Sequence, residues 1–517
     1  MTPKRSIPII CLVLLAFLPL AAQEPEEKNR QEYTLRDAVY QALQNNLDIQ
    51  IQQGTFQSSL EALEISESIF IPTFSSEVTL SEYNNPANSV FESTIRKSTG
   101  FSLNLSLEQQ LATGGTISVS FDNSRDESNS LTSSVNPYLD TRLQFNLNQP
   151  LLKGFGTFIT KKDIRIATHD LEKAELDLKE KILEIIFTVE DAYWNLVYQH
   201  ENLKVKQEEL ARAKDLLKQN EIKVKVGTAP RIDILDAQAS RASAESELLR
   251  AEKTLQDAQE NLRKILNLSR EELTILPSET PDIRRFQPDL EELLLEALNH
   301  RPDVLKARLD LKNRNIEVRY YRNQMLPDLQ LQAQYYTTGW GGVEKIFDGN
   351  PFFGGTQIGS VEKDIWESMS EAIKALYQNY SVSLNLQIPL SFKEEKARLA
   401  QARLAAKNAL LTLKNTENTV YSEIKSVVKE LQSNLEIIRA SEVSLELEKQ
   451  KVRAEEKKFS VGLSTNYEVL QKRRDLSQAQ ANYLSSIKDY LLTIARINRY
   501  LGRTFQEYDI HFDNYAR

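Results

Sequence analysis

The sequence predicts an α+β fold in which one structural unit occurs twice along the chain. Some segments alternate strictly between apolar and polar side chains, a pattern typical of half-buried β-strands. Other segments are long and carry an apolar residue at every seventh position, which predicts helices that supercoil around one another. Two glycine-containing stretches, one in each half, also align at a constant offset, which pairs Val226 with Val461, Gly227 with Gly462 and Asp233 with Glu468, and other segments of the two halves align at larger offsets. We therefore expect a tandem duplication.

Composition limits the classes of function. Of the 517 residues, 26% are charged, and the formal net charge of −9 argues against a nucleic-acid partner. Residues 1–22 predict a secretory signal peptide, because Lys4 and Arg5 precede an apolar run that ends in Ala21-Ala22. The only cysteine, Cys11, lies in that run, so we expect no disulfide and no cysteine metal site in the exported chain.

The rest of the chain gives no sign of an enzyme. Its four histidines are scattered without a recognisable ligand pair, at His169, His200, His300 and His511. The carboxylates likewise show no catalytic spacing, so we expect no catalytic residue, no metal and no cofactor. After the signal peptide no run of about 18 apolar residues occurs, so entry into a membrane would require a β-barrel.

The first repeat is expected over 23–287 and the second over 288–517. Within each repeat a helical segment leads into strands, and a long helical hairpin follows. The expected segments in chain order are a helix at about 34–68, strands at about 72–150, a hairpin at 157–268, a linker at 269–287, helices at 288–325, strands at about 327–390, a hairpin at 393–501 and a C-terminal tail at the equator of the helices.

The strand segments carry one apolar and one polar face. The alternating segments are 101–108, 117–121, 143–147, 329–335 and 382–388. A soluble sandwich would show the same alternation, but nearby aromatic residues such as Tyr335, Trp340 and Tyr380 favour membrane strands with an interfacial girdle. The polar segments 83–98, 125–139 and 337–378 would then be extracellular loops. Whether 99–124 adds barrel strands or an extra hairpin stays open.

Each long hairpin is expected to turn at a glycine. A glycine after a helix end supplies the left-handed residue that stops the helix, and Pro230 can begin the next one. The helices before the turns carry the seven-residue repeat, through Ile182, Val189, Leu196, Leu203, Leu210, Leu217 and Val224 in the first, and Ile424, Leu431, Ile438, Leu445, Val452 and Phe459 in the second. After the first turn Ala237, Ala244, Ala251 and Ala258 form a seam that allows close packing. An ordinary coiled-coil rod would share these features.

These features together resemble the TolC-type outer-membrane efflux proteins over nearly the whole mature chain. The motifs that carry the resemblance are the duplication, the paired Val-Gly turns, the helix-to-strand junctions Ile71-Pro72 and Leu326-Pro327, and the strand exits Gln149-Pro-Leu-Leu152 and Ile388-Pro-Leu390. The resemblance implies a homotrimer whose strands form one shared barrel in the outer membrane, continuous with a coiled-coil barrel of helices in the periplasm. It implies a passive exit duct for efflux or type I secretion that contacts outer-membrane lipid, a periplasmic adaptor and an inner-membrane transporter. The alternative is a secreted or periplasmic coiled-coil scaffold without channel activity.

The resemblance also implies candidate site residues near the turns. Glu468 matches an acid that rings the closed aperture, whereas Gln471 is uncharged where relatives often carry a second acid. Asp233 matches a residue that latches the closed state, but its usual partners are altered to Phe459 and Ser464. Acids are also favoured at any helix start, which is the simpler interpretation of Asp233 and Glu468. The residues expected to contact the adaptor are Val226, Gly227, Thr228, Val461, Gly462 and Leu463.

Overall fold

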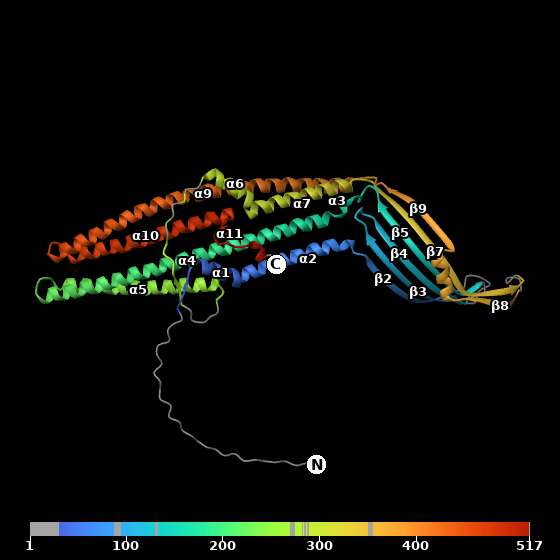
Figure 1. Ribbon diagram of the computed structural model, residues 1–517, viewed down its shortest axis with the longest axis horizontal. Coiled ribbons are helices and arrows are strands. Elements are labelled where there is room, and N and C mark those ends of the chain that lie inside the picture. Colours follow the sequence, from blue (N-terminus) through green and yellow to red (C-terminus); the bar gives the residue numbers. More distant parts are fainter. Residues whose placement is uncertain are drawn as a thin grey trace, which may run out of the picture. The chain divides into compact units, whose positions relative to one another are not determined.

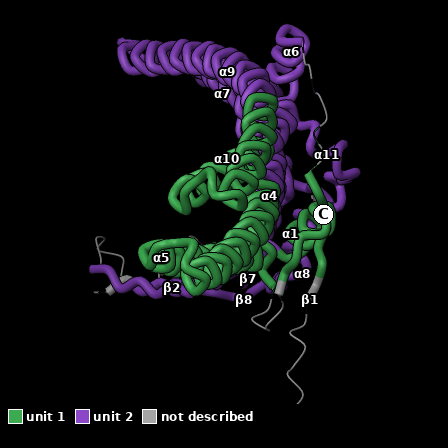
Figure 2. The backbone as a smooth tube through the Cα atoms, turned by 90° about the vertical axis from the view of Figure 1, so that its left-hand side faces the viewer, with its two compact units in different colours: residues 1–45, 188–283, 438–488 green, residues 46–187, 284–437, 489–517 purple. Residues whose placement is uncertain are grey.

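The computed structural model of this protein describes residues 30–86, 95–129, 133–268, 274–281, 283, 286, 289–349 and 355–515. The expected signal peptide lies outside these residues, as does part of the expected linker. The chain forms two compact units, which Figure 2 colours separately. Unit 1 comprises residues 1–45, 188–283 and 438–488, and unit 2 comprises residues 46–187, 284–437 and 489–517.

The elements are labelled in Figure 1. The helices are α1 (Leu35–Asn45), α2 (Leu47–Glu67), α3 (Thr157–Thr160), α4 (Lys162–Lys225), α5 (Ile232–Ile265), α6 (Leu290–His300), α7 (Pro302–Gln324), α8 (Ile365–Ile373), α9 (Lys393–Ser460), α10 (Asn466–Leu501) and α11 (Thr504–Glu507). The strands are β1 (Arg30–Tyr33), β2 (Thr73–Pro86), β3 (Ile95–Gln110), β4 (Thr116–Ser128), β5 (Val135–Pro150), β6 (Thr274–Pro277), β7 (Asp328–Asp348), β8 (Thr356–Lys363) and β9 (Tyr377–Gln387).

Unit 2 contains a seven-stranded antiparallel sheet (Figure 1). Its order is β2-β3-β4-β5-β7, and β7 then pairs with β8 over its last residues and with β9 over its first. Because β3 and β4 lie between β2 and β5, residues 99–124 add strands to this sheet and do not form a separate hairpin. The register places Leu105 opposite Phe121, so the apolar residues of neighbouring strands share one face.

The segments between strands are shorter than the polar loops that we expect from the sequence. β2 continues to Pro86, and β4 continues to Ser128. The segment 337–378 is not a loop, because it holds the end of β7, all of β8 and helix α8. The alternation of apolar and polar side chains is weak at these strand ends, so the sequence pattern does not reveal them. A strand continues as long as its backbone pairs with a neighbouring strand, as Glu344 of β7 does with Val361 of β8.

The first helical segment is two helices and not the single helix expected over 34–68. The break lies at Asn46, whose backbone is extended and whose side chain accepts hydrogen bonds from the N–H groups of Asp48 and Ile49. A side chain that satisfies the first N–H groups of a helix starts a new helix there. None of the helices in the described ranges combines the length and the apolar character needed to cross a membrane.

The apolar repeats of the long helices form the core, as the sequence predicts. Buried positions of the two repeats include Ile182, Val189, Leu196, Leu210 and Leu217 on α4, and Ile424, Leu431, Ile438, Leu445, Val452 and Phe459 on α9. The seam of Ala237, Ala244, Ala251 and Ala258 on α5 is buried too. In unit 1, Ala244 packs against Leu210 of α4. Small side chains here let two helices approach closely along a supercoil.

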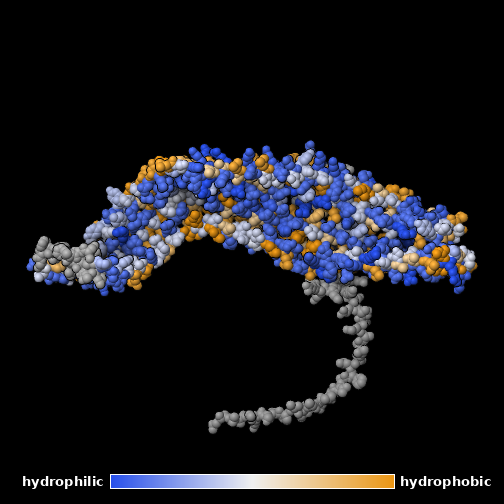
Figure 3. Space-filling model, turned by 180° about the vertical axis from the view of Figure 1, so that it is seen from behind, coloured by the Kyte–Doolittle hydropathy of each residue, from blue (hydrophilic) through white to orange (hydrophobic). Residues whose placement is uncertain are grey.

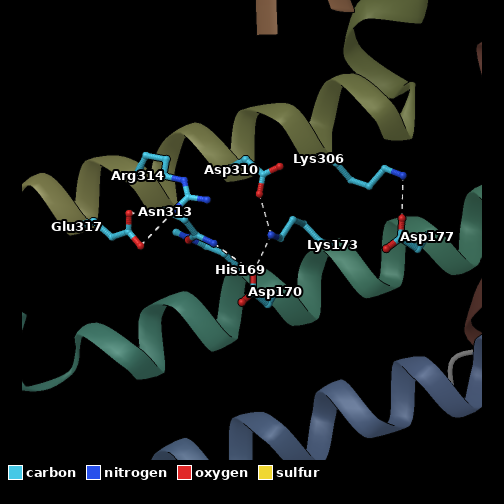
Figure 4. Close-up of polar contacts among 9 residues, drawn as sticks. All are labelled: His169, Asp170, Lys173, Asp177, Lys306, Asp310, Asn313, Arg314 and Glu317. Atoms are coloured by element: carbon cyan, nitrogen blue, oxygen red, sulfur yellow. Dashed lines mark hydrogen bonds and ion pairs between the residues drawn. The ribbon is translucent and has the colours of Figure 1, made fainter. Parts of the chain in front are cut away.

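A row of polar contacts joins α4 to α7 within unit 2 (Figure 4). Nδ1 of His169 lies 2.6 Å from Oδ1 of Asn313, and Lys173 bridges Asp170 of its own helix to Asp310 of α7. Lys306 of α7 reaches back to Asp177 and Glu180 of α4. Burial disfavours the charge of Lys306, but these two hydrogen-bonded carboxylates outweigh it and raise the pKa of Lys306 above its usual value. The row therefore helps to fix the register of these two helices.

Candidate gate and docking site at the hairpin turns

Unit 1 contains the turn ends of two helical hairpins, α4 with α5 and α9 with α10, and both turns end a helix with the same backbone motif (Figure 1). The N–H groups of Thr228 and Leu463 donate to the carbonyls of Lys223 and Lys458, over 2.8 Å in each case. Gly227 and Gly462 have φ angles of 81° and 82°. This is the motif in which a left-handed residue closes the helix and satisfies its last carbonyls. The prediction that glycine ends both helices is confirmed.

The residues expected to contact an adaptor project from these turns. Val226, Val461 and Leu463 are 71%, 69% and 79% exposed, and the two glycines and Thr228 are exposed as well. Three apolar side chains thus lie exposed to solvent at the two turns.

Two buried asparagines join the hairpins just behind the turns. The side-chain amide of Asn220, on α4, donates to Oδ1 of Asn466, at the start of α10, over 3.0 Å. Both amides also donate to the main-chain carbonyl of Asp233, at the start of α5, over 3.2 Å from Asn220 and 3.4 Å from Asn466. Three helix segments therefore meet at two side chains that are 0% and 2% exposed.

An aromatic contact supports the same junction. Phe459 of α9 is buried in a cluster with Leu216 of α4 and with Val469 and Leu470 of α10. The ammonium group of Lys223 lies 3.6 Å from the centre of the Phe459 ring and donates to the Phe459 carbonyl over 3.2 Å. Phenylalanine can accept a cation at its face although it lacks a hydroxyl group. In this chain Phe459 thus joins α9 to α4 through Lys223.

The remaining predicted residues lie apart from this junction. Glu468 is exposed, and its N–H donates to the hydroxyl of Thr465 over 3.3 Å. Gln471 is half-buried and donates to Asp475 on its own helix over 3.1 Å. Ser464, where the resemblance implies an arginine, hydrogen-bonds the carboxylate of Glu455 and, together with Lys458, lowers the pKa of Glu455 below its usual value.

The structure brings Asp233 to the junction through its main chain. The Asp233 carbonyl accepts both asparagine amides, while no hydrogen bond of its carboxylate occurs among the described residues. Sequence reasoning did not single out Asn220, Asn466 or Lys223. A signal for Asn220 was present, because it lies three residues after Leu217 on the apolar stripe of α4, and one polar residue in such a stripe often fixes register.

The two hairpins are joined here by the hydrogen bonds of Asn220 and Asn466, by the contact of Lys223 with Phe459 and by the apolar cluster around Phe459. Within the described ranges, no three histidine, cysteine, aspartate or glutamate side chains are grouped so that they could hold a metal ion.

Comparison with known proteins identifies the class. The sequence model of the outer membrane efflux protein family matches residues 116–268 and 293–503, which is most of the chain. The chain therefore belongs to the outer membrane efflux protein family. It is an outer-membrane exit duct with a helical part in the periplasm.

Particular relatives agree with this assignment. The outer membrane protein TolC of Vibrio cholerae is 24% identical over 327 residues, which cover 63% of this chain and 69% of that protein. The pyoverdine export outer membrane protein OpmQ of Pseudomonas putida is 22% identical over 306 residues, or 53% of this chain and 65% of OpmQ. The fold is similar to that of the Campylobacter jejuni CmeC outer membrane channel, with a TM-score of 0.65 and 17% identity over 92% of this chain and 89% of CmeC.

Proposed function

We propose that three copies of this chain close one β-barrel in the outer membrane, continuous with a periplasmic barrel of helices. The observation that carries the proposal is that, among the described residues, the two outer strands of the sheet, β2 and β9, each pair on one side only. Unpaired edges leave backbone N–H and C=O groups without partners, and closure with identical copies removes such edges.

The two faces of the sheet suit a barrel wall. Leu105, Phe121 and Leu143 are register partners on one face, while their neighbours Asn104, Asp122 and Arg142 are partners on the other. The apolar face includes strongly exposed residues on both outer strands, namely Phe74, Val78 and Leu80 on β2 and Tyr380, Val382, Leu384 and Leu386 on β9. Figure 3 shows apolar residues gathered at the bend where the strands of unit 2 meet its helices. An apolar outer face and a polar inner face are typical of membrane barrels.

The dimensions of unit 2 support six barrel strands from each copy, namely β2, β3, β4, β5, β7 and β9. Three copies would give eighteen strands, and with strands about 4.8 Å apart and tilted by about 40° the circumference is about 110 Å. The helices α2, α4, α7 and α9 of unit 2 would give twelve helices, at about 9–10 Å each, or about 110–120 Å. Twelve strands would span only about 75 Å. The two additional strands, β3 and β4, thus let the sheet match the ring of helices.

The exposed turns are proposed to contact a periplasmic adaptor, which connects the duct to an inner-membrane transporter. The apolar side chains of Val226, Val461 and Leu463 would supply the contact surface. The junction of Asn220 and Asn466 would hold the hairpins in the closed state, and three copies of Glu468 would ring the aperture. Selectivity for the exported molecule is assigned to the transporter, as expected for a passive duct.

Crosslinking tests the assembly, and the absence of cysteine after Cys11 makes the test clean. Val78→Cys on β2 and Leu384→Cys on β9, in one chain, should give covalent dimers and trimers with a short bis-maleimide in outer membranes. Leu105→Cys and Phe121→Cys form the control pair. These two positions lie opposite each other on the neighbouring strands β3 and β4, so they should crosslink only within one chain. Monomers alone from the first pair, with the control pair crosslinked, would contradict the barrel. Planar-bilayer conductance then separates a duct from a coiled-coil scaffold, which conducts nothing.

A further inference from the structure

Helix α8 lies on the apolar face of the sheet, at the level where the apolar side chains end. On β7 the apolar face continues from Tyr335 to Thr337, whose hydroxyl donates to the carbonyl of Ala372 in α8 over 2.7 Å. On β5 it continues from Leu143 to Thr141, which lies 2.8 Å from the hydroxyl of Ser368. On both strands the apolar side chains of this face are therefore followed by small polar side chains where α8 covers the sheet.

The sheet is adapted to receive this helix. Gly339 lies on the same face of β7, and a Cβ atom there would overlap the carbonyl oxygen of Ser368. Asn123 of β4 donates to Thr141 over 2.7 Å and extends the polar seat to a third strand. The side chains of Asn123, Thr141, Thr337 and Ser368 are all buried. The hydrogen bonds and the missing side chain place α8 firmly on the outside of the sheet.

One flank of α8 remains apolar and uncovered. Trp366, Ile373 and Leu376 are 71%, 66% and 60% exposed. Trp366 and Ile373 are seven residues apart, which places them on one side of α8, and Leu376 lies three residues beyond the end of the helix. The neighbouring exposed side of the helix carries Glu367, and Lys374 follows at the helix end; both are also exposed. A short helix with one apolar and one charged side, both in contact with solvent, has the pattern of a helix that lies in a membrane interface.

We propose that α8 is an interfacial anchor, in which Trp366, Ile373 and Leu376 insert between headgroups and acyl chains of the outer leaflet. This inference rests on the proposed insertion of the sheet into the outer membrane. The apolar flank is continuous with the apolar face of β9, because Leu376 directly precedes that strand and Tyr380 and Val382 follow on it.

The level of α8 agrees with this location. From Leu329, the first apolar residue of β7, to Gly339 beneath α8, the strand rises by about 33 Å, or about 25 Å of height at a tilt of about 40°. The lipid-facing apolar band of outer-membrane barrels is about 25 Å tall and ends in aromatic residues. Tryptophan is enriched at that boundary because its ring is apolar and its N–H is polar. Trp366 thus lies at the height at which a lipid interface would meet it.

Depth-dependent fluorescence quenching tests the anchor in the full-length protein reconstituted into phospholipid vesicles. The chain has three tryptophans, so Trp194→Phe with Trp340→Phe leaves Trp366 as the only one. Lipids brominated near the headgroup should quench Trp366 about twofold or more relative to lipids brominated near the chain ends. A protein that retains only Trp194, on α4, should not be quenched by either lipid.

A third protein separates failure of the anchor from failure of membrane insertion. It has Val382→Trp on the apolar face of β9 as its only tryptophan. If Val382→Trp is quenched and Trp366 is not, the sheet is inserted and the anchor is wrong. If neither is quenched, the proposed barrel itself fails. Blue-shifted emission of Trp366 that bromine does not quench would mean that a second copy or another protein covers the flank, which also overturns the proposal.

Discussion

The side chain of Asn220 on α4 donates a hydrogen bond to that of Asn466 at the start of α10, over 3.0 Å, although 246 positions separate the two residues along the chain. The bond joins two helical hairpins directly behind their turns. Because both side chains are buried, an unpaired amide would cost more free energy here than at the surface. The pair is therefore the natural point at which to test whether the hairpins can separate.

Asn466→Ala removes the acceptor of Asn220 and one donor to the Asp233 carbonyl. The loss should be about 1–3 kcal/mol, because a buried polar group loses its partner. Amide hydrogens in the first turns of α5 and α10 should then exchange about tenfold faster or more, since about 1.4 kcal/mol is a factor of ten. Hydrogen exchange with mass spectrometry measures this. Tyr467→Ala, at a neighbouring residue that is 63% exposed, is the control and should change little.

Gly227→Val and Gly462→Val should block export while the assembly survives. Both glycines have positive φ, and a residue with a Cβ pays about 1–2 kcal/mol there. A Cβ at either position would meet no atom within 4 Å, so any effect comes from the backbone and not from a clash. Asparagine tolerates positive φ, so Gly227→Asn should retain export. Release of the exported molecule by cells that carry the duct with its transporter reports export, and cysteine crosslinking reports assembly. Normal export in both valine variants would reject the docking role of the turns.

Glu468→Ala should raise single-channel conductance modestly or relieve block by multivalent cations added from the periplasmic side. In the proposed trimer, three Glu468 carboxylates would lie around one axis and concentrate cations, and without a second acid at Gln471 this ring would be weak. Asp233→Ala keeps the carbonyl that both asparagines use, so it should favour opening less than Asn466→Ala and leave block unchanged. Planar-bilayer recordings of the three variants compare these effects. If Glu468→Ala changes neither conductance nor block, Glu468 is only an acid favoured at a helix start.

Ionisation of Tyr193 at high pH should destabilise unit 1. Its hydroxyl donates to the Tyr33 carbonyl over 3.0 Å, and burial, together with the charge of Glu279, raises the pKa of Tyr193 to about 12. The folded state therefore holds this proton more tightly than the unfolded state, in which tyrosine has a pKa of about 10. The stabilisation is complete below about pH 10 and is lost as the pH rises towards about 12, by roughly 2 kcal/mol.

Thermal unfolding at pH 9 and pH 11.5, followed by circular dichroism, measures this loss. Tyr193→Phe lacks the ionisable group but keeps the ring, so its melting temperature should fall less between the two pH values. Other tyrosines titrate in both proteins, and the difference between the two proteins isolates Tyr193. Equal decreases in melting temperature would show that Tyr193 does not carry the effect.

Much of the fold follows from local rules that the sequence displays directly. Gly227 and Gly462 end their helices because glycine adopts positive φ more readily than residues with a side chain, and that rule needs no knowledge of distant residues. The buried repeats of α4 and α9 follow from the seven-residue period, and the apolar face of the sheet follows from the two-residue period. Asn46 shows what apolar periodicity does not predict. Its capping side chain divides a continuous helical pattern into two helices.

The sequence by itself thus determined most helices, most strands and the two turns, because these depend on the chain's own periodicity and on backbone conformation. Only the tertiary structure decided which side chains meet across elements. The pairing of Asn220 with Asn466 depends on the register of two hairpins, and the seat of α8 depends on Gly339 facing Ser368 across the sheet. The ends of β7 and β8 likewise depend on their pairing with each other. Hydrogen bonds between distant residues form only after packing sets their distance and angle. No periodic pattern in the sequence reports that geometry.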